Sequence, residues 1–228
     1  MRETLERLGP GLGRVFTGAL LALAGAGAGA APAEAGDAAP GALTGSWPVA
    51  EATSLHFEFP VGELTLVATD GKEVKAFAEV DCWSDDSDCL EVAEDYRFTS
   101  RRAGKRLIVK LEGPRFNFGN GREIEARVEV PRSLLLDVDM GIGELTLTGF
   151  EHGADIALGI GEVEIHSPRG SVRDVRLRVG LGEASFDDGR RSIERVSVFG
   201  NGLHWKAGTG NSTVAVKLGI GEASVVLN

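Results

Sequence analysis

The chain has 228 residues, of which 43% are hydrophobic, and its formal net charge at pH 7 is -10. This length and this hydrophobic content are sufficient for one domain with a sizeable core. The negative charge excludes nucleic acid and anionic membrane surfaces as default partners, because no cluster of Lys or Arg is large enough to offset it. Glycine is abundant at 32 residues and aromatic residues make up only 6%, which indicates many tight backbone turns rather than packing of bulky helices.

The N-terminal segment 1–30 is predicted to be a signal peptide. Three arginines precede an uncharged apolar run that extends to residue 33, and Ala-Gly-Ala at 28–30 provides a small-residue cleavage site. An uncleaved membrane anchor is the alternative, although the Gly/Ala-rich half of the run is weakly hydrophobic. Residues 31–45 are rich in Ala, Pro and Gly and are predicted to form a flexible leader. We therefore expect a bacterial periplasmic, cell-surface or secreted protein, with no stable membrane insertion after cleavage.

The two cysteines, Cys82 and Cys89, are predicted to form a disulfide. An even, closely spaced pair in an exported chain favours this bond, which for so short a loop stabilises by roughly 2 to 3 kcal/mol. A metal site is the alternative, but two thiols are too few ligands for zinc. The nearby carboxylates that could offer oxygens to Ca²⁺ are Asp81, Asp85, Asp86 and Asp88. They lack the spacing and turn glycine of an EF-hand loop, so we expect neither a metal nor a cofactor.

A Gly-x-Gly-Glu motif recurs along the second half of the chain, each time followed by an apolar strand pattern. The copies are GIGELTL at 141–147, GIGEVEI at 159–165, GLGEASF at 180–186 and GIGEASV at 219–225. With the second glycine as position zero, an earlier copy has Gly62 at zero and a further one has Asn201 there; Asn is the residue that best replaces Gly in a left-handed backbone. From the second copy onwards the intervals are 18, 21, 19 and 20 residues, which is typical of a solenoid.

The apolar positions change parity across each motif. They stand at -5, -3 and -1 before position zero and at +2 and +4 after it. Because strand side chains alternate with period two, the change requires a corner at which the zero glycine and the following Glu face away from the core. The side chains at -1, among them Ile142, Ile160 and Leu181, are expected inside. We predict an all-β fold, a small single-chain β-solenoid of about 20-residue rungs stacked in parallel.

Residues 67–136 interrupt the repeat. A strand pattern at 74–80 is followed by the cysteine loop, a short helix candidate over 88–98 and a hairpin pattern over 96–113. We predict an inserted β-hairpin and short helix on a flank of the stack. The whole of 46–228 is treated as one domain.

The order of these segments resembles the bacterial putative-adhesin family. The resemblance lies in the acidic or helical excursion, the V-x-V-P strand at 128–131 and the successive units of the type DVDMGIGELTLTG. It covers about residues 50–228, although the family usually has Gly-Asp or Gly-Asn where this chain has Gly-Glu. It implies an envelope domain with a toast-rack-like stack of strands and no established catalytic residues. The expected function is a non-enzymatic, adhesin-like binding or scaffold module whose partner is an envelope or surface protein or glycan.

The +1 position of the stack is expected to carry a row of carboxylates. Its members are Glu63, Glu144, Glu162, Glu183, Gly202 and Glu222, so Gly202 interrupts the row. Neighbouring carboxylates about 4.8 Å apart repel by under ~1 kcal/mol per pair in water, which a solvated corner tolerates. The row is therefore either a polar corner or a site that recruits a basic partner or a divalent cation. The candidate partner-binding residues are Glu144, Glu162, Glu183 and Glu222.

Two other functions follow if the rungs stack in sequence order. Strand 222–227 would then be an uncapped edge that pairs copies of the chain into a homo-oligomer. The same order would place His204 beside Ser185 and His166 beside Asp187, as a weak hydrolase requires. No pocket or oxyanion-holding turn adjoins Ser185 in the sequence pattern. We therefore assign no catalytic residues and expect the protein not to be an enzyme.

Overall fold

Strands account for nearly all regular structure of the residues that the computed structural model describes, which are 42–82, 87–114, 122–198, 200 and 202–228. The predicted signal peptide, most of the leader, Asp85, Asp86 and Asn201 lie outside them. The elements are β1 (Ala42–Pro48), β2 (Ser54–Thr69), β3 (Glu73–Cys82), α1 (Ser87–Ala93), β4 (Arg97–Ala103), β5 (Arg106–Glu112), β6 (Arg122–Pro131), β7 (Leu135–Thr148), β8 (Ala154–Ser167), β9 (Val172–Asp187), β10 (Ser192–Ser197), β11 (Gly202–Lys206) and β12 (Ser212–Leu227). The all-β prediction is confirmed.

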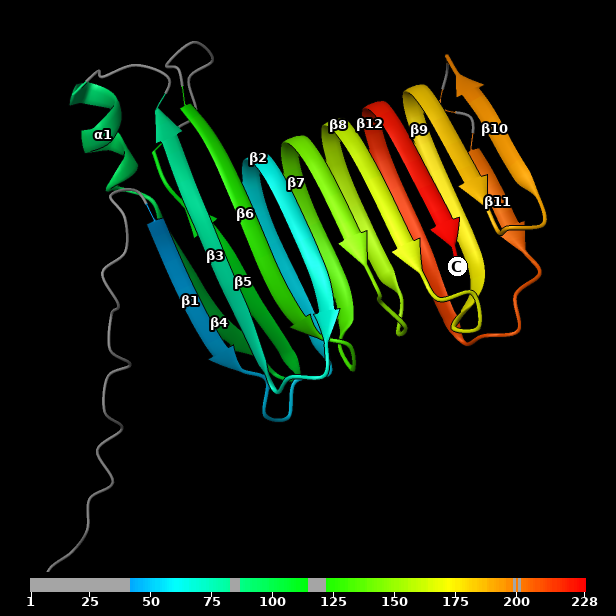
Figure 1. Cartoon of the computed structure of the whole chain (residues 1–228), viewed down its shortest axis with the longest axis horizontal. Coiled ribbons are helices and arrows are strands. Elements are labelled where there is room, and N and C mark those ends of the chain that lie inside the picture. The colour runs from blue at the N-terminus through cyan, green and yellow to red at the C-terminus, as the bar shows by residue number, and fades with distance from the viewer. Residues whose placement is uncertain (1–41, 83–86, 115–121, 199, 201) are drawn as a thin grey trace, which may run out of the picture. The chain divides into compact units, whose positions relative to one another are not determined.

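The strands form one open sheet. The order along it is β1-β3-β6-β2-β7-β8-β12-β9-β10, with β5 and β4 attached beside β2 and β11 beside β9 (Figure 1). Five long strands, β2, β7, β8, β12 and β9, lie parallel in the middle of this order. Their zero glycines stand in one register, in the order Gly62, Gly143, Gly161, Gly221 and Gly182.

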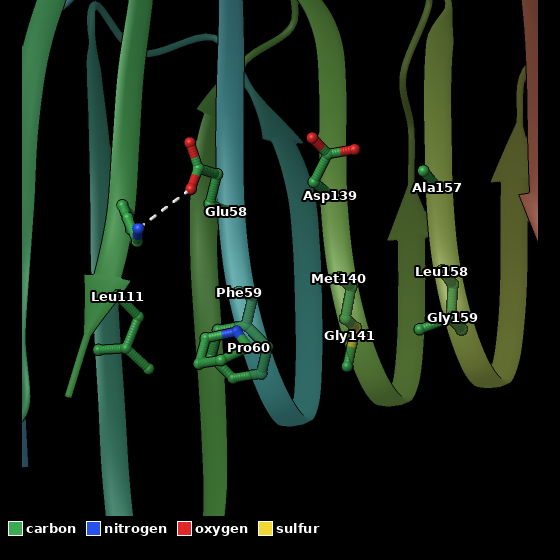
Figure 2. Close-up of a pocket in the computed structure, with 11 residues that line it drawn as sticks. Glu58, Phe59, Pro60, Leu111, Asp139, Met140, Gly141, Ala157, Leu158 and Gly159 are labelled. Carbon is green, nitrogen blue, oxygen red and sulfur yellow. Dashed lines mark ion pairs between the residues drawn. The ribbon is translucent and has the colours of Figure 1, made fainter. Parts of the chain in front are cut away.

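Each of the five long strands bends at its glycine motif, and we call each bent strand a rung. Figure 2 shows three of them folding back beyond Pro60, Gly141 and Gly159. The first half of β2 pairs with β5 and its second half with β6. In the same way, the first half of β9 pairs with β11 and its second half with β10. The sheet therefore has two layers that join at the bends, and the core lies between them.

The bend takes up more residues than the sequence predicts. In β8, Leu158 at -3 and Val163 at +2 are buried, as expected. The -1 side chains expected in the core are instead exposed by 46% at Ile160 and 49% at Leu181, and Ile142 is only partly buried. The prediction for this position is wrong because the chain begins to turn at the -2 glycine, so the alternation of side chains stops before -1.

Close packing of successive rungs requires both glycines of the motif. A Cβ on Gly161 would lie 1.8 Å from the carbonyl oxygen of Gly143 on the neighbouring rung, and the φ of Gly161 is +138°. A Cβ on Gly159 would lie 2.5 Å from the carbonyl oxygen of Gly141. Real Cβ atoms do not approach backbone oxygens so closely, and L-residues rarely adopt the first φ. The repeated Gly-x-Gly therefore serves the stacking of the bends.

The rungs do not stack in sequence order. The last strand, β12, lies between β8 and β9 (Figure 1), and both of its edges are paired. The predicted uncapped edge at 222–227 is therefore wrong. The unit around Asn201 contributes β10 and β11, which run antiparallel to β9. This unit has Phe199 at -2 and Asn201 at zero, the two positions at which the glycines of β7, β8, β12 and β9 have no room for a Cβ against the neighbouring rung.

The inserted segment extends both layers rather than one flank. The predicted hairpin is confirmed as β4 and β5, which continue the layer of first halves. Strands β6, β3 and β1 continue the layer of second halves. Because β1 starts at Ala42, the residues 42–45 belong to the sheet and not to a flexible leader. The helix ends at Ala93, earlier than expected, because from Arg97 the chain pairs with β5.

The Cys82–Cys89 disulfide is confirmed, with a Cα–Cα distance of 6.1 Å. It links the end of β3 to α1. All described residues belong to one compact unit, Asp37–Asn228. Within the described part of the chain, no helix has the length and apolar character needed to cross a membrane.

Candidate functional site

An open groove of about 600 Å³ lies along the first halves of β2, β7 and β8, next to the end of β5 (Figure 2). Its apolar base consists of the buried side chains Phe59, Leu111, Met140 and Leu158. Charged side chains at its rim are Glu58, Lys110 and Asp139. A volume of this size and a mostly apolar lining with few polar groups are typical of ligand-binding clefts.

The groove results from the same feature that bends the rungs. Next to the bends the groove is lined by the -2 residues Pro60, Gly141 and Gly159. Two of these are glycines, so few side-chain atoms occupy this part of the surface. Strand β5 pairs with β2 only as far as Lys110 opposite Glu58. Beyond this pair β2 bends away, and the separation of the two strands opens one end of the groove.

The charged side chains at the rim of the groove have partners within the chain. Lys110 Nζ lies 3.4 Å from Glu58 Oε2, as the dashed line in Figure 2 marks. His56, which the sequence does not single out as anything but an isolated histidine, has Nε2 3.7 Å from Asp139 Oδ2 and Nδ1 3.0 Å from Asp137 Oδ2. The groove therefore offers a mainly apolar surface with a few charged groups at its rim.

A second surface, which we call the bend edge, runs along the stack beside the groove. Its apolar row holds the -1 side chains in stack order, namely Val61, Ile142, Ile160, Ile220 and Leu181. Its acidic row holds the +1 side chains in the same order, namely Glu63, Glu144, Glu162, Glu222 and Glu183. Glu125 of β6 stands opposite Glu63 and lengthens the acidic row.

The structure brings together all four predicted partner-binding residues, Glu144, Glu162, Glu183 and Glu222, in one continuous row. The expected interruption by Gly202 is wrong, because Gly202 pairs with Arg178 in the first half of β9. The sequence-order assumption placed Gly202 between Glu183 and Glu222, whereas these two stand directly opposite each other.

The acidic row has no counter-charge of its own. Within the part of the chain that the structure describes, none of its five rung carboxylates forms an ion pair. Burial raises the pKa of Glu63, and the carboxylates of Glu144, Glu125 and Glu123 raise it further. Burial also raises the pKa of Glu183, and the carboxylates of Glu194 and Glu222 raise it further. These directions show that the carboxylates repel one another.

A divalent cation does not explain the row. Among the described residues, no group of three or more His, Cys, Asp or Glu side chains is placed to hold a metal ion. The carboxylates follow one another along the stack instead of converging on one point, whereas Ca²⁺ needs six to eight oxygens around it. The arrangement suits a partner with several positive charges in a line.

The residues considered for hydrolysis do not meet. Ser185 stands opposite Ser224 and Glu194, and Val226 separates His166 from Asp187. The predicted adjacency of His166 and Asp187 is wrong because β12 lies between β8 and β9. That of Ser185 and His204 is wrong because β11 pairs with the first half of β9.

His204 stands opposite Arg176 on β9, and its Nε2 lies 3.2 Å from Asp174 Oδ2. Burial alone would raise the pKa of Asp174, but hydrogen bonds from His204 and Arg176 outweigh this effect and lower the pKa. His204 therefore belongs to a hydrogen-bonded pair that joins β11 to β9, and it is not placed to activate Ser185.

Comparison with known proteins gives a likeness of fold. No protein-family model and no curated protein matches the sequence. A solved structure, that of a putative cell adhesion protein from Clostridium sporogenes, matches 82% of this chain and 99% of its own chain, with a TM-score of 0.51 and 12% sequence identity. The fold is adhesin-like. At this identity the likeness extends to the fold alone.

Proposed function

We propose that the protein is a non-enzymatic, adhesin-like binding module of the bacterial cell envelope, and that the bend edge is its main contact surface. The observation that carries this proposal is the continuous row of unpaired carboxylates beside an exposed apolar row. Exposed apolar rows rimmed by polar groups mark interaction sites on soluble proteins. Membership of the putative-adhesin family, which the order of the segments indicates, belongs to the same proposal.

Three further observations support a binding role in the envelope. The solved neighbour is described as a cell adhesion protein. The disulfide between Cys82 and Cys89 is stable only in an oxidising compartment. Ser185 and His204, which the sequence analysis considered for hydrolysis, lie apart. Export by cleavage of 1–30 is part of the proposal, and the mass of the mature protein recovered from its host is the test of that step.

A binding assay on envelope preparations tests the proposed function. Fluorescently labelled protein should bind saturably to envelope preparations of its host, and the double variant Glu144→Gln with Glu162→Gln should bind at least about tenfold more weakly. The matched control is Glu91→Gln with Glu94→Gln, which removes the same charge from an exposed region around α1. No saturable binding, or hydrolysis of envelope esters that disappears in Ser185→Ala, would contradict the proposal.

A further inference from the structure

The apolar row of the bend edge is exposed to solvent on three adjacent rungs, β8, β12 and β9, and is partly buried at Val61 and Ile142. Ile160, Ile220 and Leu181 are exposed by 46%, 47% and 49%, and Val61 and Ile142 continue the row on the adjacent rungs. Five rungs about 4.8 Å apart make a row about 19 Å long. A partner that covers such a row removes large aliphatic side chains from water, and this lowers the free energy of the complex.

The neighbouring acidic row lacks the ion pairs that several carboxylates of the sheet form within the chain. Farther from the bends, Glu58 pairs with Lys110 at 3.4 Å, and Asp155 pairs with Lys217 at 3.5 Å. The five rung carboxylates of the bend edge have no such pair among the described residues. These carboxylates are therefore available to cationic groups of another molecule. A second copy does not supply them, because it presents the same acidic row and carries a formal charge of -10.

The geometry of the edge selects the secondary structure of the partner. Both edges of β7, β8 and β12 are already paired, so an added strand finds no free backbone groups on these rungs. On a helix, side chains four residues apart lie about 5 to 6 Å apart, close to the spacing of the rungs. A row of about 19 Å corresponds to about 13 helical residues.

From these features, and on the basis of the proposed function, we infer that the bend edge binds a cationic amphipathic helix of a partner protein. The apolar face of the helix covers the row from Val61 to Leu181. Its Lys and Arg side chains reach the row from Glu63 to Glu183. The two rows are two residues apart along each rung, or about 6 to 7 Å, which lies within the reach of a Lys or Arg side chain on the flank of a helix.

The probe is a synthetic peptide about 18 residues long, in which Leu and Lys follow the period of an amphipathic helix. Its binding to the purified protein is measured by fluorescence anisotropy at physiological salt. Two control peptides carry Glu in place of Lys, or the same Leu and Lys in strict alternation as a strand would. We expect saturable one-to-one binding of the helical Lys peptide, and binding at least about tenfold weaker for both controls.

Variants of the protein separate the bend edge from general attraction to an acidic surface. Glu144→Gln with Glu162→Gln, and separately Ile160→Thr with Ile220→Thr, should each weaken binding of the helical peptide about tenfold or more. The control pair Glu91→Gln with Glu94→Gln should change it less than about twofold. Equal losses in the two charge variants, or no loss in the Ile variant, would overturn the inference.

If the bend-edge variants also leave envelope binding unchanged, the proposed contact surface fails as well. If they abolish envelope binding but not peptide binding, only the helical partner is wrong.

Discussion

Gly161→Ala should destabilise the stack of rungs more than any other substitution considered. The added Cβ would lie 1.8 Å from the carbonyl oxygen of Gly143, and the residue would have to keep a φ of +138°. Holding an L-residue in this region costs about 1 to 3 kcal/mol, and forcing neighbouring backbones apart costs about as much again. We therefore expect Gly161→Ala to lower the free energy of unfolding by about 3 to 5 kcal/mol, a large part of the stability of a typical domain.

Three other glycines separate the two contributions. Gly159 tests close approach without positive φ, since its Cβ would lie 2.5 Å from the oxygen of Gly141. Gly104 tests backbone conformation alone, with a φ of +60° and no atom within 4 Å of an added Cβ. Gly170 has neither constraint and is the control. We expect losses of about 2 kcal/mol for Gly159→Ala and about 1 kcal/mol for Gly104→Ala, and a gain of about 0.4 to 1 kcal/mol for Gly170→Ala.

Urea unfolding followed by circular dichroism measures all four variants against the parent chain. The order of stability should be Gly170→Ala, Gly104→Ala, Gly159→Ala and Gly161→Ala, from most to least stable. If Gly161→Ala unfolds within about 0.5 kcal/mol of Gly170→Ala, the bends do not pack as described, and the reasoning about the Gly-x-Gly motif is refuted.

Further predictions concern charge and the disulfide. Because the pKa of Glu63 is raised in the folded state, its charge destabilises the fold above that pKa, and the loss is relieved as pH falls through it. Glu63→Gln should therefore stabilise by a few tenths of a kcal/mol at pH 7 and by nothing near pH 3 in thermal melts. Asp174 has a lowered pKa, so its stabilisation is present above pH 3.8 and is lost as pH falls through the folded pKa. Asp174→Asn should cost about 1 to 3 kcal/mol at pH 7 in urea titrations, and clearly less in strong acid. Cys82→Ser with Cys89→Ser should lower the unfolding free energy by roughly 2 to 3 kcal/mol, and an unchanged urea midpoint would contradict this.

Much of the fold could be predicted from the sequence because its causes are local. The parity change between Leu158 and Val163 requires a bend in any strand, and the pair Cys82 and Cys89 is close enough to bond wherever the chain runs. The hairpin 96–113 has its own alternation and turn residues. These features need no knowledge of which strands become neighbours.

The order of the rungs could not be read from the period. Every rung carries the same motif, so the spacing gives the length of a unit but not its neighbour. The local signal lies in the unit around Asn201, where Phe199 and Asn201 stand at the two positions that are glycine in β7, β8, β12 and β9. These two side chains are the reason that this unit does not continue the parallel stack. The continuity of the acidic row, and the separation of Ser185 from His204, both follow from this single change of order.

The alternation of apolar residues alone also could not predict that the apolar row is exposed. Alternation fixes which residues share a face of a straight strand but not the residue at which the strand starts to bend. The close approach of the -2 glycines, such as Gly159 to Gly141, sets that point, and it exists only once rungs are stacked.

The order of the rungs along the bend edge is the central claim, because both rows and the proposed partner depend on it. The direct test is dipolar broadening in continuous-wave electron paramagnetic resonance of spin labels attached to cysteines at exposed positions of the apolar row. Labels at Ile160→Cys and Ile220→Cys should lie on adjacent rungs about 5 Å apart, and labels at Ile160→Cys and Leu181→Cys about 10 Å apart. Stronger broadening in the first pair is the predicted result. Stronger broadening in the second pair would contradict the account.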